Sequence, residues 1–134
     1  FPHGDDIILF FASVWMMKQN GEKMYIISTS NQLSAIDPLR NILGQDAIYY
    51  ALDHVGPIQH KTLVTEDLVK LLKEIKPDKI YIQAWCGSHP EHDMSHIEEI
   101  MAIKQAGIDA TVYEFPTFTG YYGPLSSSCA PIDE

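Results

Sequence analysis

Hydrophobic residues along this chain fall into two alternating patterns. Short runs rich in β-branched and aromatic residues are typical of buried strands, and they occur at 23–29, 58–64, 79–85 and 109–115. Apolar residues at helical spacing predict helices before and between them, at 7–19, 38–54, 66–76 and 94–105. Strands that alternate with helices indicate βαβ units. The pattern therefore predicts an α/β fold, with a Rossmann-like parallel sheet covered by helices on both faces.

Residues with strong preferences for helix ends support these boundaries. Asn20-Gly21 is a C-cap signal after the first helix, and Ala106-Gly107 closes the last one. Asp37-Pro38 combines a preferred N-cap with proline at the first helical position. The helix at 7–19 is apolar nearly all round, so we expect it to be buried. The tail from Pro116 is rich in Pro, Gly and Ser, and we expect it to wrap over the surface.

The composition is that of a globular chain with an acidic balance. The 134 residues suit a single domain, 1–134, and 46% of them are hydrophobic. Nine Lys+Arg oppose eighteen Asp+Glu for a formal net charge of −9, so we expect neither nucleic acid nor an anionic membrane surface as a partner. The longest apolar run, 7–17, is half of the roughly 20 residues that a bilayer span needs. Two cysteines, Cys86 and Cys129, do not make a disulfide scaffold, and free thiols favour a reducing, cytoplasmic location.

Two polar loops are dense in metal-binding residue types. One is 2–6, directly before the first helix, and the other is 88–93, directly after the strand at 79–85. Ligands of parallel sheets bind beyond the carboxyl ends of the strands, where the second loop lies. Two His and one carboxylate form a common catalytic zinc set with one position left for water. His3, Asp6 and His92 can supply such a set.

Other interpretations of the same residues stay open. An Asp-Asp pair before a helix is often an N-cap beside a solvated neighbour, and one His-x-x-His is a weak metal signal. Cys86 lies three residues before His89 and could be a thiolate ligand instead. A nucleotide-binding α/β domain is disfavoured because the sequence has no Gly-x-Gly-x-x-Gly and no phosphate-binding loop.

The two loops carry a resemblance to a known family. PHGDD, residues 2–6, resembles the His-Pro-Asp-Asp-Glu signature of the PIG-L/LmbE family of zinc-dependent N-deacetylases. HPEHDMSH, residues 89–96, resembles the family's His-Pro-Asp-His-x-x-x-His segment, and ATVYEFPTF, residues 110–118, is similar to its closing Tyr/Phe-rich strand. The resemblance covers most of the chain, although only the two short motifs are specific.

The resemblance implies a role for each matched residue. His3, Asp6 and His92 would bind zinc, and Asp5 would be the general base that takes a proton from the attacking water. His89 would assist at the carbonyl oxygen and at the leaving amine. The same ligand set accepts other divalent metals such as Fe²⁺.

The sequence also departs from the family pattern. Gly4 replaces Pro and Ile7 replaces the usual Glu, while Ser30-Asn31-Gln32 stands where the family has a Gly-Glu pair. The strand that delivers the first motif in the family would lie upstream of Phe1, so the domain is expected to lack its first strand in this sequence.

The predicted function is that of a metal-dependent N-deacetylase. The substrate expected from the resemblance is a small molecule, an N-acetyl amino sugar of the N-acetylglucosamine type or a related conjugate. The alternative is a non-catalytic α/β module that binds a metal or a sugar. Aromatic residues in and before the tail could stack on a sugar ring, but we expect them to pack the tail or form a subunit interface, which leaves a homo-oligomer open; they are Phe115, Phe118, Tyr121 and Tyr122.

Overall fold

The computed structural model describes residues 2, 6–29, 37–52, 57–87, 89–116 and 130–131. The elements in chain order are η1 (Asp6–Phe10), α1 (Phe11–Gln19), β1 (Met24–Ser28), α2 (Asp37–Leu43), η3 (Gly44–Asp46), β2 (Ala47–Ala51), α3 (Pro57–Ile75), β3 (Lys79–Gln83), α4 (Pro90–Ala106), β4 (Thr111–Phe115) and β5 (Ala130–Pro131). Within this part of the chain, no helix is long and apolar enough to cross a bilayer.

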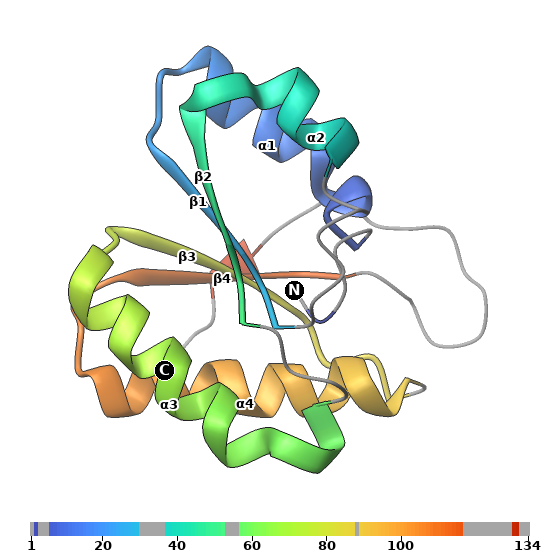
Figure 1. Ribbon diagram of the computed structural model, residues 1–134, viewed down its shortest axis with the longest axis vertical. Helices are drawn as coiled ribbons and strands as arrows, with labels where there is room; N and C mark the ends of the chain where they lie inside the picture. Colours follow the sequence, from blue (N-terminus) through green and yellow to red (C-terminus); the bar gives the residue numbers. More distant parts are fainter. Residues whose placement is uncertain are drawn as a thin grey trace.

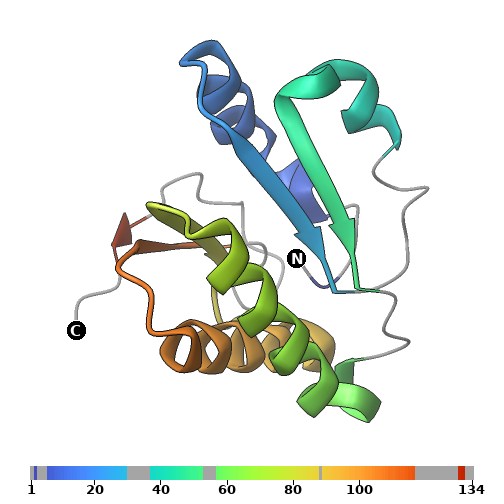
Figure 2. The same cartoon turned by 60° about the vertical axis from the view of Figure 1, so that its left-hand side comes forward.

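The strands form two short sheets, each with a parallel pair. β1 pairs with β2, with Met24 opposite Ala47, and β3 pairs with β4, with Lys79 opposite Thr111. β5 adds an antiparallel strand to β4. Helices α1 and α2 accompany β1 and β2, whereas α3 and α4 lie together beside β3 and β4 (Figures 1 and 2). The predicted α/β class is confirmed. The described residues form two sheets, and the single Rossmann-like sheet stays a prediction.

The buried apolar residues form two clusters. The first cluster joins η1 and α1 to the β1–β2 sheet and reaches Phe115 of β4, and its buried members are Ile7, Phe10, Val14, Met24, Ile26, Leu39, Leu43, Ala47 and Phe115. The second joins α3 to α4 through Val64, Leu68, Leu72 and Ala102. Burial of these faces supplies the main driving force for both halves of the fold.

A cavity of about 730 Å³ lies between β1 and β3. Four consecutive residues of each strand line it, 24–27 in β1 and 79–82 in β3. Successive side chains of a strand point to opposite faces, so a cavity lined by consecutive residues runs along the strand edges. Lys79 Nζ lies 3.3 Å from Glu22 Oε2, and both residues belong to the cavity lining. The expectation of a further strand upstream of Phe1 stays a prediction.

Two predicted elements are wrong. Residues 47–51, expected as helix, form strand β2, because Gly44 adopts a φ of 64° that ends helix α2 and the following AIYYA run has high strand propensity. Residues 58–64, expected as a strand, belong to helix α3, which begins at Pro57. The spacing of Val64, Leu68 and Leu72 places these side chains on one buried face of that helix.

The first helix is buried along one face only. Phe10 and Val14 are buried in the core, whereas Ile8 is 59% and Met16 64% exposed. The expectation of all-round burial is therefore wrong, and the first turns form the 3₁₀ segment η1 rather than regular α-helix. Helix α4 begins at Pro90, earlier than expected, and ends at Gly107 with a left-handed φ of 62°, as predicted. Of the tail, residues 117–129 and 132–134 lie outside the described residues.

Candidate active site

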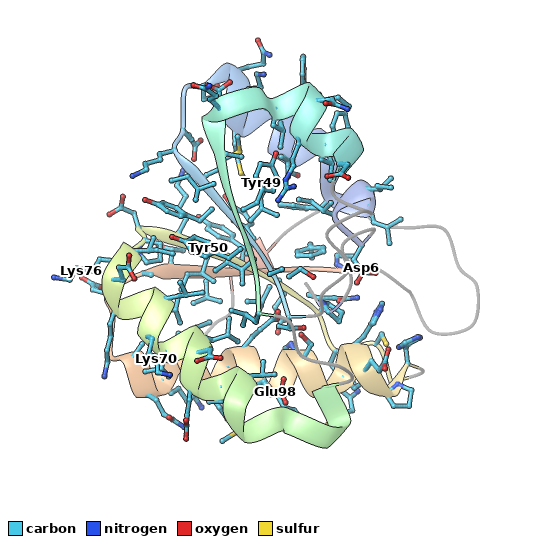
Figure 3. The ribbon with its side chains drawn as sticks, viewed as in Figure 1. Asp6, Tyr49, Tyr50, Lys70, Lys76 and Glu98 are labelled. Carbon is cyan, nitrogen blue, oxygen red and sulfur yellow. The ribbon has the colours of Figure 1, made fainter. Side chains whose placement is uncertain are left out.

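The fold brings Asp6 and His92 together from distant parts of the sequence. Asp6 is the first residue of η1, and His92 lies in the first turn of α4, directly after β3. Asp6 Oδ1 lies 3.5 Å from His92 Nε2, and both side chains are buried. Figure 3 shows Asp6 at the side of the molecule where β3 and β4 end. The pair therefore occupies the carboxyl ends of the strands, where the sequence predicts the site.

The distance between Asp6 Oδ1 and His92 Nε2 matches the distance between two ligand atoms bound to one metal ion. An N–H···O hydrogen bond is usually about 2.7–3.2 Å long, so 3.5 Å is long for a direct bond between Asp6 and His92. Zinc–ligand bonds of about 2.0–2.2 Å in a tetrahedral site place two ligand atoms about 3.4 Å apart. A carboxylate oxygen and an imidazole nitrogen are both ordinary zinc ligands, so this pair fits the metal.

Gln83 contacts the other ring nitrogen of His92. It is the last residue of β3, its side chain is buried, and its side-chain amide forms a short hydrogen bond with His92 Nδ1. The main-chain carbonyl of Gln83 also accepts a hydrogen bond of 2.8 Å from His96 Nδ1–H. Strand β3 thus holds two histidines of helix α4 through one residue.

His89 stands beside His92 at the start of α4. It is the residue before the first helical position, with an extended φ of −127° and ψ of 104°, and Pro90 follows it. A residue before proline is restricted to such extended conformations. The ring centroids of His89 and His92 lie 4.2 Å apart. The rings of His89 and His92 are therefore in contact at the start of helix α4.

Asp93 holds the loop that leads to His89. Its Oδ1 accepts hydrogen bonds of 2.9 Å from the main-chain N–H of Cys86 and of Gly87. Burial alone would raise the pKa of Asp93, but the two main-chain hydrogen bonds, the Cys86 side chain and the charge of His92 together lower the pKa below its ordinary value. Gly87 has a left-handed φ of 70°, a conformation that disfavours other residues at this turn.

A second histidine–carboxylate pair lies next to the first. His96 Nε2 is 3.6 Å from Glu114 Oε1 on β4, and the ring of Trp85 meets the His96 ring edge-on at 6.3 Å. Sequence reasoning included His96 in the second motif but missed Gln83 and Glu114. No local signal in the sequence marks either residue, because their contacts with the two histidines depend on how strands β3 and β4 pack against helix α4.

The comparisons with known proteins show a likeness to a solved structure. No protein-family model and no curated protein matches this sequence. The crystal structure of the A40926 pseudoaglycone deacetylase Dbv21 superposes with a TM-score of 0.64 at 20% identity. The chain shares the fold of this deacetylase. The match covers 84% of the chain and 60% of the deacetylase, so the chain spans about 60% of that protein's length.

Some of the predicted site residues lie within the described part of the chain, and others lie outside it. Asp6, His89 and His92 come together as the sequence predicts, whereas His3 and Asp5 lie outside the described residues. Among the residues that the structure does describe, no group of three or more His, Cys, Asp or Glu side chains is placed to hold a metal. The three predicted metal ligands therefore stay a prediction. The Asp6–His92 pair is the part of the set whose geometry supports it. The thiol of Cys86 lies 4.0 Å from the main-chain oxygen of His89.

Proposed function

We propose that this chain forms the catalytic part of a zinc-dependent hydrolase that removes an acetyl group from an N-acetyl amino sugar or a related conjugate. The observation that carries the proposal is the buried pair of Asp6 Oδ1 and His92 Nε2 at 3.5 Å, at the strand ends of a deacetylase fold. His3, Asp6 and His92 would hold the metal, and Fe²⁺ is an alternative to Zn²⁺.

The chain's own residues divide the work of amide hydrolysis. Bound zinc supplies Lewis acidity and makes water a stronger nucleophile at neutral pH. Asp5 takes a proton from the water while the oxygen of that water forms a bond to the carbonyl carbon. His89 donates a hydrogen bond to the developing oxyanion and a proton to the leaving nitrogen. The carbon–nitrogen bond breaks, and the products are acetate and the free amine.

The test is amine release by the zinc-loaded protein and by its Asp5→Asn variant. The substrates are N-acetylglucosamine, its conjugates and an acylated glycopeptide pseudoaglycone, because the structural neighbour is named for a substrate of the last kind. We expect Asp5→Asn to keep zinc and to lose roughly 10²–10⁴-fold in rate, the usual contribution of a positioned acid or base. Asp109→Asn, at an exposed aspartate, is the matched control. Hydrolysis at the unchanged rate in Asp5→Asn would remove Asp5 from the mechanism.

The same assay separates the alternative of a non-catalytic metal- or sugar-binding module. Ile7 stands where the resembled family has Glu, and here it is 1% exposed within the apolar core. No carboxylate is therefore available at position 7 to support the site. Stoichiometric zinc without amine release from any substrate would favour the binding module.

A further inference from the structure

Trp85 presents an indole ring at the surface, directly after the strand that leads to the candidate site. The residue is 56% exposed, although tryptophan is highly buried on average. It lies two residues after the end of β3 at Gln83, whose side chain contacts His92. The ring of Trp85 meets the ring of His96 edge-on, with centroids 6.3 Å apart, and His96 follows His92 by about one helical turn. The exposed indole therefore stands beside the candidate site.

The main chain around Trp85 is fixed on both sides. Ala84 donates a hydrogen bond of 2.9 Å to the last main-chain oxygen of β4, and the N–H of Cys86 donates one of 2.9 Å to Asp93 Oδ1. At Gly87, an added Cβ would lie 3.4 Å from Trp85 Nε1, so the turn passes close to the indole. A ring held in this way loses little conformational freedom when a ligand covers it, which reduces the cost of binding.

The other tryptophan of the chain shows what distinguishes Trp85. Trp15 in α1 is 41% exposed, but the ring of Phe11 stacks on it at 6.2 Å, and Lys18 Nζ lies over it, 5.9 Å from the ring centroid. In the edge-on contact with His96, at most one face of the Trp85 indole is covered. Because 56% of this residue is exposed, the other face is accessible to a ligand.

Two hydrogen-bond acceptors lie next to the indole. His96 Nδ1–H donates to the main-chain oxygen of Gln83, so in the neutral ring Nε2 carries a lone pair. This Nε2 lies 3.6 Å from Glu114 Oε1, which is longer than the usual hydrogen bond of about 2.7–3.2 Å, and the Glu114 side chain is 35% exposed. Two acceptors at this separation suit a ligand that carries hydroxyl groups on neighbouring ring carbons.

An open aromatic face beside two acceptors is a combination that can bind a sugar. The C–H groups on one face of a pyranose carry partial positive charge and meet the negative face of an aromatic ring, and burial of both surfaces adds a hydrophobic gain. We propose that Trp85 is a specificity-determining residue, whose indole stacks on the pyranose ring of the substrate while His96 Nε2 and Glu114 accept hydrogen bonds from two of its hydroxyl groups. This inference rests on the proposed function, because the acetamido group of the same sugar would face the Asp6–His92 pair.

The first experiment needs no metal. The chain has two tryptophans, so Trp15→Phe makes Trp85 the only source of tryptophan emission, and Trp85→Phe leaves only Trp15. Titration with oligomers of N-acetylglucosamine should shift the emission of the Trp15→Phe protein to shorter wavelength as the indole becomes buried, and should not shift that of Trp85→Phe. Sorbitol, which has hydroxyl groups but no ring, is the control ligand. Emission of the Trp15→Phe protein that does not respond to the sugar overturns the inference.

The second experiment compares the affinities of variants for the same oligomers by NMR titration. Trp85→Ala removes the aromatic face, and we expect its dissociation constant to rise by roughly 10-fold or more, whereas Trp85→Phe should lose less. Glu114→Gln keeps an acceptor but removes the charge, so we expect a rise of roughly fivefold. Trp15→Phe and Glu74→Gln, at an exposed residue of α3, are the matched controls. Unchanged affinity in Trp85→Ala overturns the inference, and unchanged affinity in Glu114→Gln overturns the role of that carboxylate.

Amine release by the zinc-loaded protein separates this inference from the proposed function. Binding energy that substrate and transition state share affects KM, so Trp85→Ala should raise KM for the N-acetyl sugar and change kcat less. Sugar binding at Trp85 without amine release would refute the hydrolase and leave the sugar site standing. Amine release with the same KM in Trp85→Ala and the unmodified protein would leave the hydrolase standing and overturn the sugar site. If Trp85→Ala does not fold, the emission of the Trp15→Phe protein decides.

Discussion

Removal of the Asp93 carboxylate should destabilise the loop that carries His89. One oxygen of Asp93 accepts two hydrogen bonds of 2.9 Å, from a partly buried N–H at Cys86 and an exposed N–H at Gly87. Hydrogen bonds to charged groups contribute about 1.5–3 kcal/mol each when shielded, and less when exposed to water. An acidic residue in the first turn of a helix adds about 0.3–1 kcal/mol. We therefore expect Asp93→Ala to lower the free energy of unfolding by about 2–3 kcal/mol.

Asp93→Asn separates the hydrogen bonds from the charge. The asparagine oxygen can still accept from Cys86 and Gly87, so this variant should lose only about 1 kcal/mol. Asp67→Ala is the control for a surface aspartate, because Asp67 forms an exposed ion pair of 2.9 Å with Lys70, and such pairs contribute about 0.3–0.5 kcal/mol.

Urea unfolding measures the loss of stability in Asp93→Ala for the whole protein, and amide hydrogen exchange measures it at the loop. Urea gives the free energies of unfolding of the metal-free proteins, and exchange reports the two loop amides directly. Exchange at Cys86 and Gly87 should accelerate in Asp93→Ala and change little in Asp93→Asn. Equal stability and equal exchange of the unmodified protein and Asp93→Ala would refute the assignment of Asp93 as the residue that holds this loop.

Two further predictions concern metal binding and pH. Elemental analysis should show that His92→Ala loses most bound zinc and that His89→Ala retains it. Amine release by His89→Ala should be roughly 10²–10⁴-fold slower. The reverse pattern would contradict the roles that the family resemblance assigns to the second motif. Burial raises the pKa of Glu99 above its ordinary value of 4.5, so the folded protein binds this proton more tightly than the unfolded chain does, and stability falls as pH rises through the raised pKa. Glu99→Gln cannot ionise, and its gain in unfolding free energy over the unmodified protein should therefore grow as the pH rises above the ordinary Glu pKa of 4.5. Glu74→Gln, at an exposed residue of α3, should show no such growth, and a gain from Glu99→Gln that is independent of pH would contradict the reasoning.

Local signals in the sequence determined several elements correctly. The runs at 23–29, 79–85 and 109–115 contain the strands β1, β3 and β4, because β-branched and aromatic side chains suit a buried strand in almost any context. Gly107 ends α4 because its left-handed φ needs only the absence of a Cβ. Signals of this kind act within one or two turns of chain, so they can be read without knowledge of the fold.

The two motifs also led to a pair of side chains that meet in the fold. Asp6 and His92 were chosen for their residue types and for their places beside predicted helices and strands, and the structure brings these two side chains together. Their role as metal ligands stays a prediction. The side chains can meet because loops that follow parallel strands lie at the same edge of a sheet.

Tertiary structure decided the rest. Residues 47–51 and 58–64 contain apolar positions that suit either a helix or a strand, so apolar spacing alone does not select β2 for the first and α3 for the second. A buried glutamine at the end of a strand gives no signal in the sequence, and neither does a glutamate one position before the end of another. Gln83 meets His92, and Glu114 meets His96, because β3 pairs with β4 and α4 packs against β3, and contacts set by tertiary packing are not encoded in local spacing.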